Sequence, residues 1–207
     1  MHVLDFQSEG CGAMIISFAG PFSWKGAAGA PCVYEVPESR ESGVYLSTVP
    51  LQNGYLIHYA GETGVSSRAK LRQKHCEYVA AMYHVYSPAE FARGEKVPLW
   101  PGYWGDEHGA NRKSKEERRA NRERLSEPIQ QMTSILRFFL APLSCDDRLR
   151  QRIKSAITLP LYDLPGQVGA FQVGLGRHHR MRKNEAPIEC VTSSPVPVLG
   201  LPERFPA

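Results

Sequence analysis

The sequence predicts a small α+β or α/β domain in which helices flank a central antiparallel or mixed sheet. Two strands, over 42–50 and 55–62, are joined by a short turn, and a basic helix follows them. A further apolar strand and a helix come later in the chain. Two strands joined through Asn-Gly form a hairpin, and strands mixed with helices build a helix-flanked sheet. At 207 residues, the chain has the length of one domain with small extensions.

The first half of the chain contains the clearest strand and helix signals. Residues 13–20 are a strand candidate, and residues 42–50 form a strand that we expect to end at Pro50. After the turn at 52–54, the strand over 55–62 is rich in aromatic and β-branched residues. Ser66 or Ser67 is expected to cap a helix reaching residue 83, with Leu71, Tyr78 and Met82 on one face and Pro88 ending the region.

The second half alternates charged and apolar segments. Residues 111–127 are charged and have no apolar stripe, so they predict an exposed helix or an insert. Residues 134–143 predict an apolar strand, and Asp146 and Asp147 can begin a helix that Pro160 stops. The tail after 165 predicts loops with one or two short strands. We therefore divide the chain into an extension over 1–40, a domain over 41–162 with an insert at about 105–127, and a basic extension over 163–207.

Composition excludes several classes of protein. The chain is 42% apolar, which suffices for a core and is unlike a disordered segment. No uncharged run reaches the length of a membrane helix, and Asp5 and Glu9 lie where a signal peptide would carry basic residues. The five cysteines are scattered and form no C-x-x-C pair, which argues against a disulfide framework or a structural zinc site. We therefore expect a cytoplasmic protein with no membrane partner.

The charge is unevenly distributed along the chain. Residues 1–67 carry two basic and six acidic side chains, whereas residues 68–207 carry 23 basic and 15 acidic ones. A positive field over the later part predicts a polyanionic partner. Solvated helix faces explain any single basic cluster equally well, so the partner has to be argued from motifs.

The predicted hairpin carries a recognisable pair of signatures. Gly-Val-Tyr occupies 43–45, Tyr-Ala-Gly occupies 59–61, and Glu-Thr-Gly follows at 62–64 before the basic helix. The arrangement resembles the GIY-YIG nuclease domain, over roughly residues 40–162, and YAGETG resembles the form that the second signature takes in stand-alone bacterial members. The resemblance implies a DNA endonuclease that hydrolyses phosphodiester bonds with Mg²⁺ or another divalent metal.

The resemblance also implies roles for residues of the hairpin and of the first helix. Tyr45 and Tyr59 are the signature tyrosines, which orient or deprotonate the attacking water. An arginine on the first helix holds the phosphate in this family, and counting from the second signature places Lys70 there. Arg68 and Arg72 lie on another flank of that helix, and either flank could face the phosphate. Lysine is a point charge rather than a bidentate clamp.

The later helix departs from the family pattern. A glutamate that binds the metal is expected there, but the sequence reads Ile-Lys-Ser-Ala-Ile over 153–157, which places Lys154 at the ligand position. An ammonium group cannot coordinate a cation. The chain is therefore a natural non-cleaving relative, a deliberately inactivated variant, or a nuclease whose ligand lies elsewhere. Glu127 and Glu62 are the fallback ligands.

A second basic surface supports a nucleic-acid partner. The tail contains Arg-His-His-Arg-Met-Arg-Lys over 177–183, which can contact phosphates along a DNA groove or form a solvated loop. The residues expected to bind DNA are Lys74, His75, Arg177, His179, Arg180, Arg182 and Lys183. The alternatives are a non-catalytic DNA-binding module on the same fold, and a protein-binding module that uses the aromatic segment at 99–104. A homodimer is compatible with double-strand cleavage.

Overall fold

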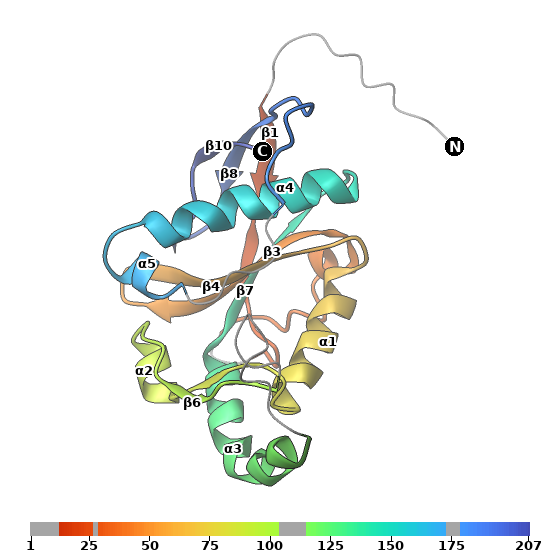
Figure 1. Cartoon of the computed structure of the whole chain (residues 1–207). Coiled ribbons are helices and arrows are strands. Elements are labelled where there is room, and N and C mark those ends of the chain that lie inside the picture. Colours follow the sequence, from red (N-terminus) through yellow and green to blue (C-terminus); the bar gives the residue numbers. More distant parts are fainter. Residues whose placement is uncertain (1–12, 27–28, 104–114, 173–178) are drawn as a thin grey trace.

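The computed structural model describes residues 13–26, 29–103, 115–172 and 179–207 (Figure 1). It has the predicted class, a mixed α+β fold with a curled mixed sheet flanked by helices. The central sheet has the strand order β2–β7–β3–β4–β9. Its strands are β2 (Ala19–Phe22), β3 (Gly43–Leu51), β4 (Gly54–Thr63), β7 (Arg137–Pro142) and β9 (Val198–Leu199).

A second, three-stranded sheet joins the two ends of the described chain. In it β8 (Glu189–Ser193) lies between β1 (Met14–Ser17) and β10 (Arg204–Pro206). β1 pairs parallel to β8, and β10 pairs antiparallel to it. β5 (Val85–Tyr86) and β6 (Pro98–Trp100) form a separate two-stranded ribbon.

The β3–β4 hairpin forms the centre of the molecule. Tyr45 on β3 pairs with Gly61 on β4, and Ser47 pairs with Tyr59 just before a register shift. β7 pairs antiparallel with the other edge of β3. β9 pairs with β4 only at Tyr55 and Leu56, so within the described residues the end of β4 has no strand along its outer edge.

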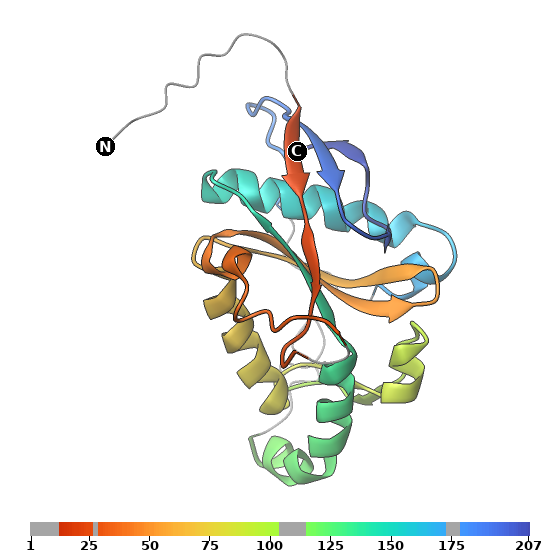
Figure 2. The same cartoon turned by 180° about the vertical axis from the view of Figure 1, so that it is seen from behind.

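Two layers cover the faces of the central sheet (Figures 1 and 2). One face packs on α4 (Asp147–Thr158), the turn η2 (Leu159–Asp163) and the second sheet, through a core that includes Val44, Phe139 and Ile153. The other face packs on α1 (Ser67–Val79), α2 (Pro88–Ala92) and α3 (Lys115–Ile135), through a core that includes Tyr45 and Leu71. The two short remaining helices are η1 (Pro37–Arg40) and α5 (Gln167–Ala170).

The first helix begins as predicted and ends earlier than predicted. The Ser66 side chain accepts a hydrogen bond from the Ala69 amide, which caps α1. The helix stops at Val79, because Ala81 is fully buried in a left-handed turn whose carbonyl accepts a hydrogen bond from the Trp100 indole. The prediction that the helix reaches residue 83 and carries Met82 on its face was therefore wrong. Pro88 likewise begins a helix instead of ending one.

The boundary between α3 and β7 also differs from the prediction. The charged stretch belongs to a helix that continues through Pro128 to Ile135, so the strand starts at Arg137 and not at 134. The Arg137 guanidinium donates to the carbonyls of residues 134, 135 and 136, which closes the end of the helix. Glu127, expected just before the strand, lies on this helix.

The last segment is more regular than predicted. Three strands and a short helix follow residue 165, where one or two strands were expected. The partners of β8 and β9 are β1 and β4, which lie more than a hundred residues earlier, out of reach of local pattern analysis. None of the helices within the described ranges is long and apolar enough to cross a membrane.

Candidate functional site

The two signature tyrosines lie next to each other on the α1 side of the hairpin. Their ring centroids are 6.2 Å apart, with the rings inclined by 40°. Tyr45 is 1% exposed and lies in the core, whereas Tyr59 is 38% exposed. Tyr59 is therefore the member of the pair that solvent and a ligand can reach.

Gly61 makes room for the buried tyrosine. A Cβ atom placed on Gly61 would overlap the Cζ and Oη atoms of Tyr45 and lie 2.7 Å from its Cε2. The glycine of Tyr-Ala-Gly is thus required by the ring that the opposite strand supplies. Tyr45 and Gly61, sixteen residues apart in the sequence, thus join the two signatures in one packing unit.

Both tyrosines are held in the neutral form. Burial raises the pKa of Tyr45 well above its ordinary value, and neighbouring phenols add to the effect. The pKa of Tyr59 is also raised, first by burial and then by the Glu62 carboxylate, with the adjacent Tyr45 hydroxyl opposing. The buried Tyr45 hydroxyl has no hydrogen-bond partner of good geometry among the described residues. At neutral pH, these hydroxyls can orient a water molecule but cannot act as phenolate bases.

The flank of α1 that faces the tyrosines carries Lys70 and Lys74. The Lys74 Nζ lies 4.2 Å from the centre of the Tyr59 ring and 5.1 Å from that of Tyr83. Lys70 is one helical turn earlier on the same flank, because residues four apart share a face. Of the cations considered for the phosphate-binding position, the structure brings Lys70 into the groove described below.

The opposite flank of α1 packs against the N-terminal segment. The Arg72 guanidinium lies 5.3 Å above the Tyr34 ring. His75 stacks on Trp24 at 4.7 Å, and its Nδ1 is 3.3 Å from the Tyr34 hydroxyl. Arg68 lies one turn before Arg72 on that flank, and its Nε is buried. Arg68, Arg72 and His75 are therefore separated from the tyrosine pair by the body of the helix.

The later helix brings Lys154 to the other side of β4. The Asp146 side chain accepts from the Leu149 amide at 2.8 Å and caps α4. Lys154 is 8% exposed, and burial lowers its pKa while the Glu62 carboxylate opposes that shift. The Lys154 charge also lowers the pKa of Lys74. The expected ligand position on α4 thus lies within electrostatic range of both Glu62 and the tyrosine side of the groove.

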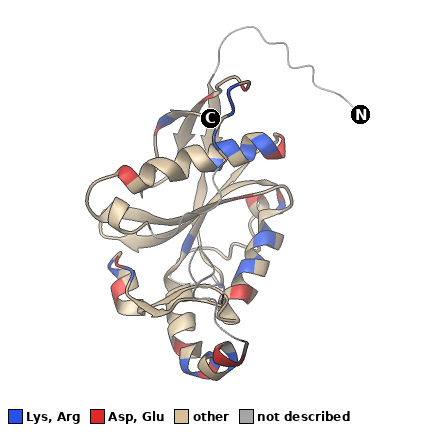
Figure 3. Ribbon diagram, in the orientation of Figure 1, with Lys and Arg blue, Asp and Glu red and all other residues tan. Residues whose placement is uncertain are grey.

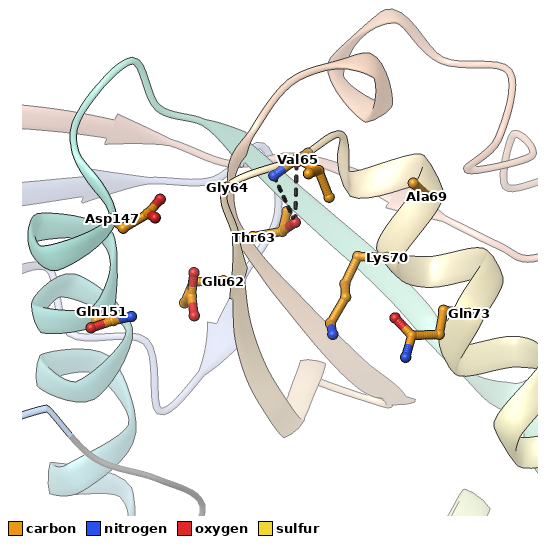
Figure 4. A pocket seen from close by; sticks show the side chains of 9 residues that line it. All are labelled: Glu62, Thr63, Gly64, Val65, Ala69, Lys70, Gln73, Asp147 and Gln151. Carbon is orange, nitrogen blue, oxygen red and sulfur yellow. Dashed lines mark hydrogen bonds between the residues drawn. The ribbon is translucent and has the colours of Figure 1, made fainter.

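A groove of about 530 Å³ lies beside the unpaired end of β4, between the first turns of α1 and α4 (Figure 4). Lys70 and Gln73 face it from α1, and Asp147 and Gln151 face it from α4. The Thr63 hydroxyl bonds both the amide and the carbonyl of Val65, which fixes the turn at the end of the strand. The complete lining is Glu62, Thr63, Gly64, Val65, Ala69, Lys70, Gln73, Asp147 and Gln151.

The side chains around the groove do not fit a divalent cation held from α4. The position that should supply a carboxylate supplies the Lys154 ammonium, and Asp147 is paired with the Arg150 guanidinium. Glu62 is left as the carboxylate closest to that lysine. The fallback Glu127 is exposed on α3 and bonds Gln131 at 3.0 Å, away from the groove. In the described part of the chain, no three His, Cys, Asp or Glu side chains gather as a metal site would require.

The basic loop over 179–183 is held against α4 (Figure 3). The His179 amide donates to the Ser155 hydroxyl at 2.7 Å, and Ser155 is one turn beyond Gln151 on the same stripe of the helix. Arg148 bonds both carboxylate oxygens of Glu185, at 2.6 and 2.7 Å, which closes the loop. The side chains of Arg180, Arg182 and Lys183 are exposed on this loop; Arg177 lies outside the described residues.

Sequence reasoning missed several residues of the groove. The sequence pattern did not indicate Gln73, Asp147 and Gln151 as site residues. The polar stripe at 147, 151 and 155 was a usable signal, because residues four apart on a helix share a face. Comparison with models of protein families, with curated proteins and with solved structures finds no match to this chain. Its function is therefore argued from this geometry.

Proposed function

We propose that the chain binds the phosphodiester backbone of DNA in the groove beside β4 and acts as a phosphodiester hydrolase of the GIY-YIG type. The observation that carries the proposal is the convergence of separate elements on one edge. The tyrosine pair comes from the hairpin, Lys70 and Lys74 come from α1, and Lys154 comes from α4. The sequence pattern alone predicts each of these residues as part of the site.

The groove has the charges that a phosphate backbone requires. Lys70 lines the groove, and the Lys154 ammonium interacts electrostatically with Glu62, which also lines it. Contacts of this kind position a duplex without reading its sequence. We therefore expect salt-sensitive binding with little dependence on base sequence.

The chemistry proposed for the groove uses the residues that are present. Hydrolysis requires an oriented water molecule and cations that stabilise the charge developing on the phosphate. Tyr59 is exposed enough to hold the water by its neutral hydroxyl, and Tyr45 supports Tyr59 from the core. Lys70 and Lys154 supply the cations. The Mg²⁺ expected from the family has no place in these steps, because its ligand position holds Lys154.

A second candidate function is a DNA-binding module that does not cleave. Lys154 favours it, since an ammonium attracts phosphate and repels a divalent cation. A third candidate, protein binding through the aromatic segment at 99–104, has less support because Trp100 is buried and bonded to the turn after α1. We further propose a cytoplasmic location, as expected from the scattered cysteines, and keep a homodimer as compatible with cleavage of both strands.

A paired cleavage assay tests the proposal. The chain and its Lys154→Glu variant are incubated with plasmid DNA in Mg²⁺ and, separately, in EDTA. Arg93→Glu, an equal charge change on the exposed side of α2, is the matched control. Cutting by the unchanged chain in both Mg²⁺ and EDTA is the expected result, because the proposed steps use no metal ion. Mg²⁺-dependent cutting by Lys154→Glu alone would instead refute hydrolysis by the present chain and identify it as a disabled nuclease. Absence of DNA binding at low salt in all three proteins would refute the proposal.

A further inference from the structure

Lys74 lies beside the tyrosine pair, one helical turn after Lys70, which lines the groove. Its side chain is half-buried between two aromatic rings, and its Nζ lies over Tyr59 from the hairpin and over Tyr83 from the turn after α1. The Tyr83 hydroxyl is itself engaged, donating to the Glu77 carboxylate at 2.5 Å. Lys74 is thus the amine held nearest to the exposed signature tyrosine in the described structure.

The charges around Lys74 come from three directions. Lys70 and Glu77 lie on its own helix, Tyr59 and Tyr83 face it with neutral phenols, and Lys154 approaches from α4. Burial, followed by the positive charge of Lys70, lowers the pKa of Lys74 to about 8; Glu77 opposes the shift and Lys154 adds to it. The pKa values of Tyr45 and Tyr59 are raised instead, so the amine and the phenols exchange protons in different pH ranges.

We infer that the ε-amino group of Lys74, which lies over the Tyr59 ring, is the proton acceptor of the reaction and takes the proton of the attacking water that the Tyr59 hydroxyl orients. The inference rests on the proposed function, because it assigns a role within the hydrolysis reaction. A general base works best when its pKa lies near the operating pH, and Lys74 meets that condition where the two tyrosines do not.

The proposed step is balanced in atoms and charge. A water oxygen forms a bond to phosphorus while its proton passes to the neutral amine of Lys74, which becomes an ammonium. The ester bond from phosphorus to the leaving oxygen breaks, and that oxygen takes a proton from solvent in the open groove. The Lys74 Nζ lies 4.2 Å from the centre of the Tyr59 ring, so a water molecule bonded to the Tyr59 hydroxyl is within reach of the amine. Lys74 then returns its proton to solvent.

The test uses bis(p-nitrophenyl) phosphate, which needs no sequence recognition and whose leaving group needs no proton. The rate is measured from pH 6 to pH 10 for the chain and for Lys74→Arg, which keeps the positive charge but cannot accept a proton in this range. The matched control is Lys96→Arg. Lys96 lies 4.5 Å over Phe171 and 5.7 Å over Tyr86 instead of over a signature tyrosine, and its pKa is lowered to about 7.

We expect the rate of the unchanged chain to rise with pH and to level off above about 8. Lys74→Arg should lose about 100-fold or more, the usual contribution of a general base, together with the inflection near pH 8. Ethylamine should restore part of the rate to Lys74→Ala, and Lys96→Arg should keep the full profile. Carbon-13 spectra of the methylated lysines, assigned with Lys74→Arg, should show Lys74 titrating near pH 8 whether or not substrate is present.

Three results would overturn the inference. The first is a Lys74→Arg profile that keeps its inflection, and the second is a Lys74 signal that titrates near 10. The third is a chain that binds DNA but hydrolyses neither DNA nor the nitrophenyl ester, which would leave only the binding part of the proposed function. A chain that does not bind DNA even at low salt would instead refute the proposed function itself.

Discussion

Gly61→Ala tests the packing unit that joins the two signatures. The added methyl group would overlap the Tyr45 ring, which is 1% exposed and held between the hairpin and α1. Neither the ring nor the strand can move into free space. The substitution should therefore destabilise the fold even though alanine is a small residue with a common backbone conformation.

The size of the effect follows from two opposing contributions. Overpacking one methyl group in a well-packed core costs about 1–3 kcal/mol. Replacing glycine by alanine restricts the unfolded chain and returns roughly 0.5 kcal/mol. The net loss of stability is about 1.5 kcal/mol, which lowers the Tm of a chain of this length by roughly 3–6 °C.

Urea unfolding followed by circular dichroism measures this loss. Gly64→Ala is the control, because a Cβ there meets side-chain ends, Asp147 Oδ1 at 2.7 Å and Arg150 Nη2 at 3.1 Å, and the exposed Asp147 can move. In a Tyr45→Leu background, Gly61→Ala should cost much less, since the ring has gone. Equal midpoints for Gly61→Ala and the unchanged chain would refute the packing argument.

Three further predictions concern charge and capping. Lys70→Ala should weaken DNA binding at all sequences and reduce the slope of log K against log salt concentration by about one. Arg72→Ala, which removes a side chain lying over Tyr34, should leave that slope unchanged. Binding titrations from 50 to 200 mM salt measure both slopes. Asp146→Ala removes the cap of α4 and should cost about 1 kcal/mol in urea unfolding. The Arg148 guanidinium lowers the pKa of Glu185 to about 2. This pair therefore stabilises the fold above the ordinary glutamate pKa, and the contribution is lost as pH falls towards 2. Acid unfolding curves of Glu185→Gln should lack this part of the pH dependence.

The sequence predicts those parts of the fold that local chemistry determines. The hairpin follows from its strand composition and turn, and the starts of α1 and α4 follow from Ser66 and Asp146. The end of α1 was out of reach, because Ala80 and Ala81 are good helix formers. A hydrogen bond from Trp100, nineteen residues later, holds the turn that ends the helix.

The candidate site was predictable to a similar extent. The pattern identified the tyrosine pair and the α4 position. It did not decide between the two flanks of α1, because both carry cations at helical spacing. The choice depends on Trp24 and Tyr34, which cover the Arg72 and His75 flank. On the other flank, Lys70 lines the groove and Lys74 lies over Tyr59. Contacts between segments this far apart are set by tertiary packing and leave no local signal.

The charge at residue 154 determines which ligand the groove is suited to. With lysine there, the ammonium groups of Lys70, Lys74 and Lys154 outnumber the Glu62 carboxylate, while Asp147 is paired with an arginine of its own helix. That balance suits a phosphodiester, which carries one negative charge per phosphate. With glutamate at 154, two carboxylates would face each other beside the same groove, a donor set that suits Mg²⁺. Because 154 is buried, the exchange changes the field inside the groove far more than a surface substitution would. Lys154→Glu should therefore bind DNA more weakly than the unchanged chain in EDTA, and added Mg²⁺ should strengthen the binding of this variant. The sign of that Mg²⁺ effect distinguishes a groove with lysine at 154 from one with glutamate there.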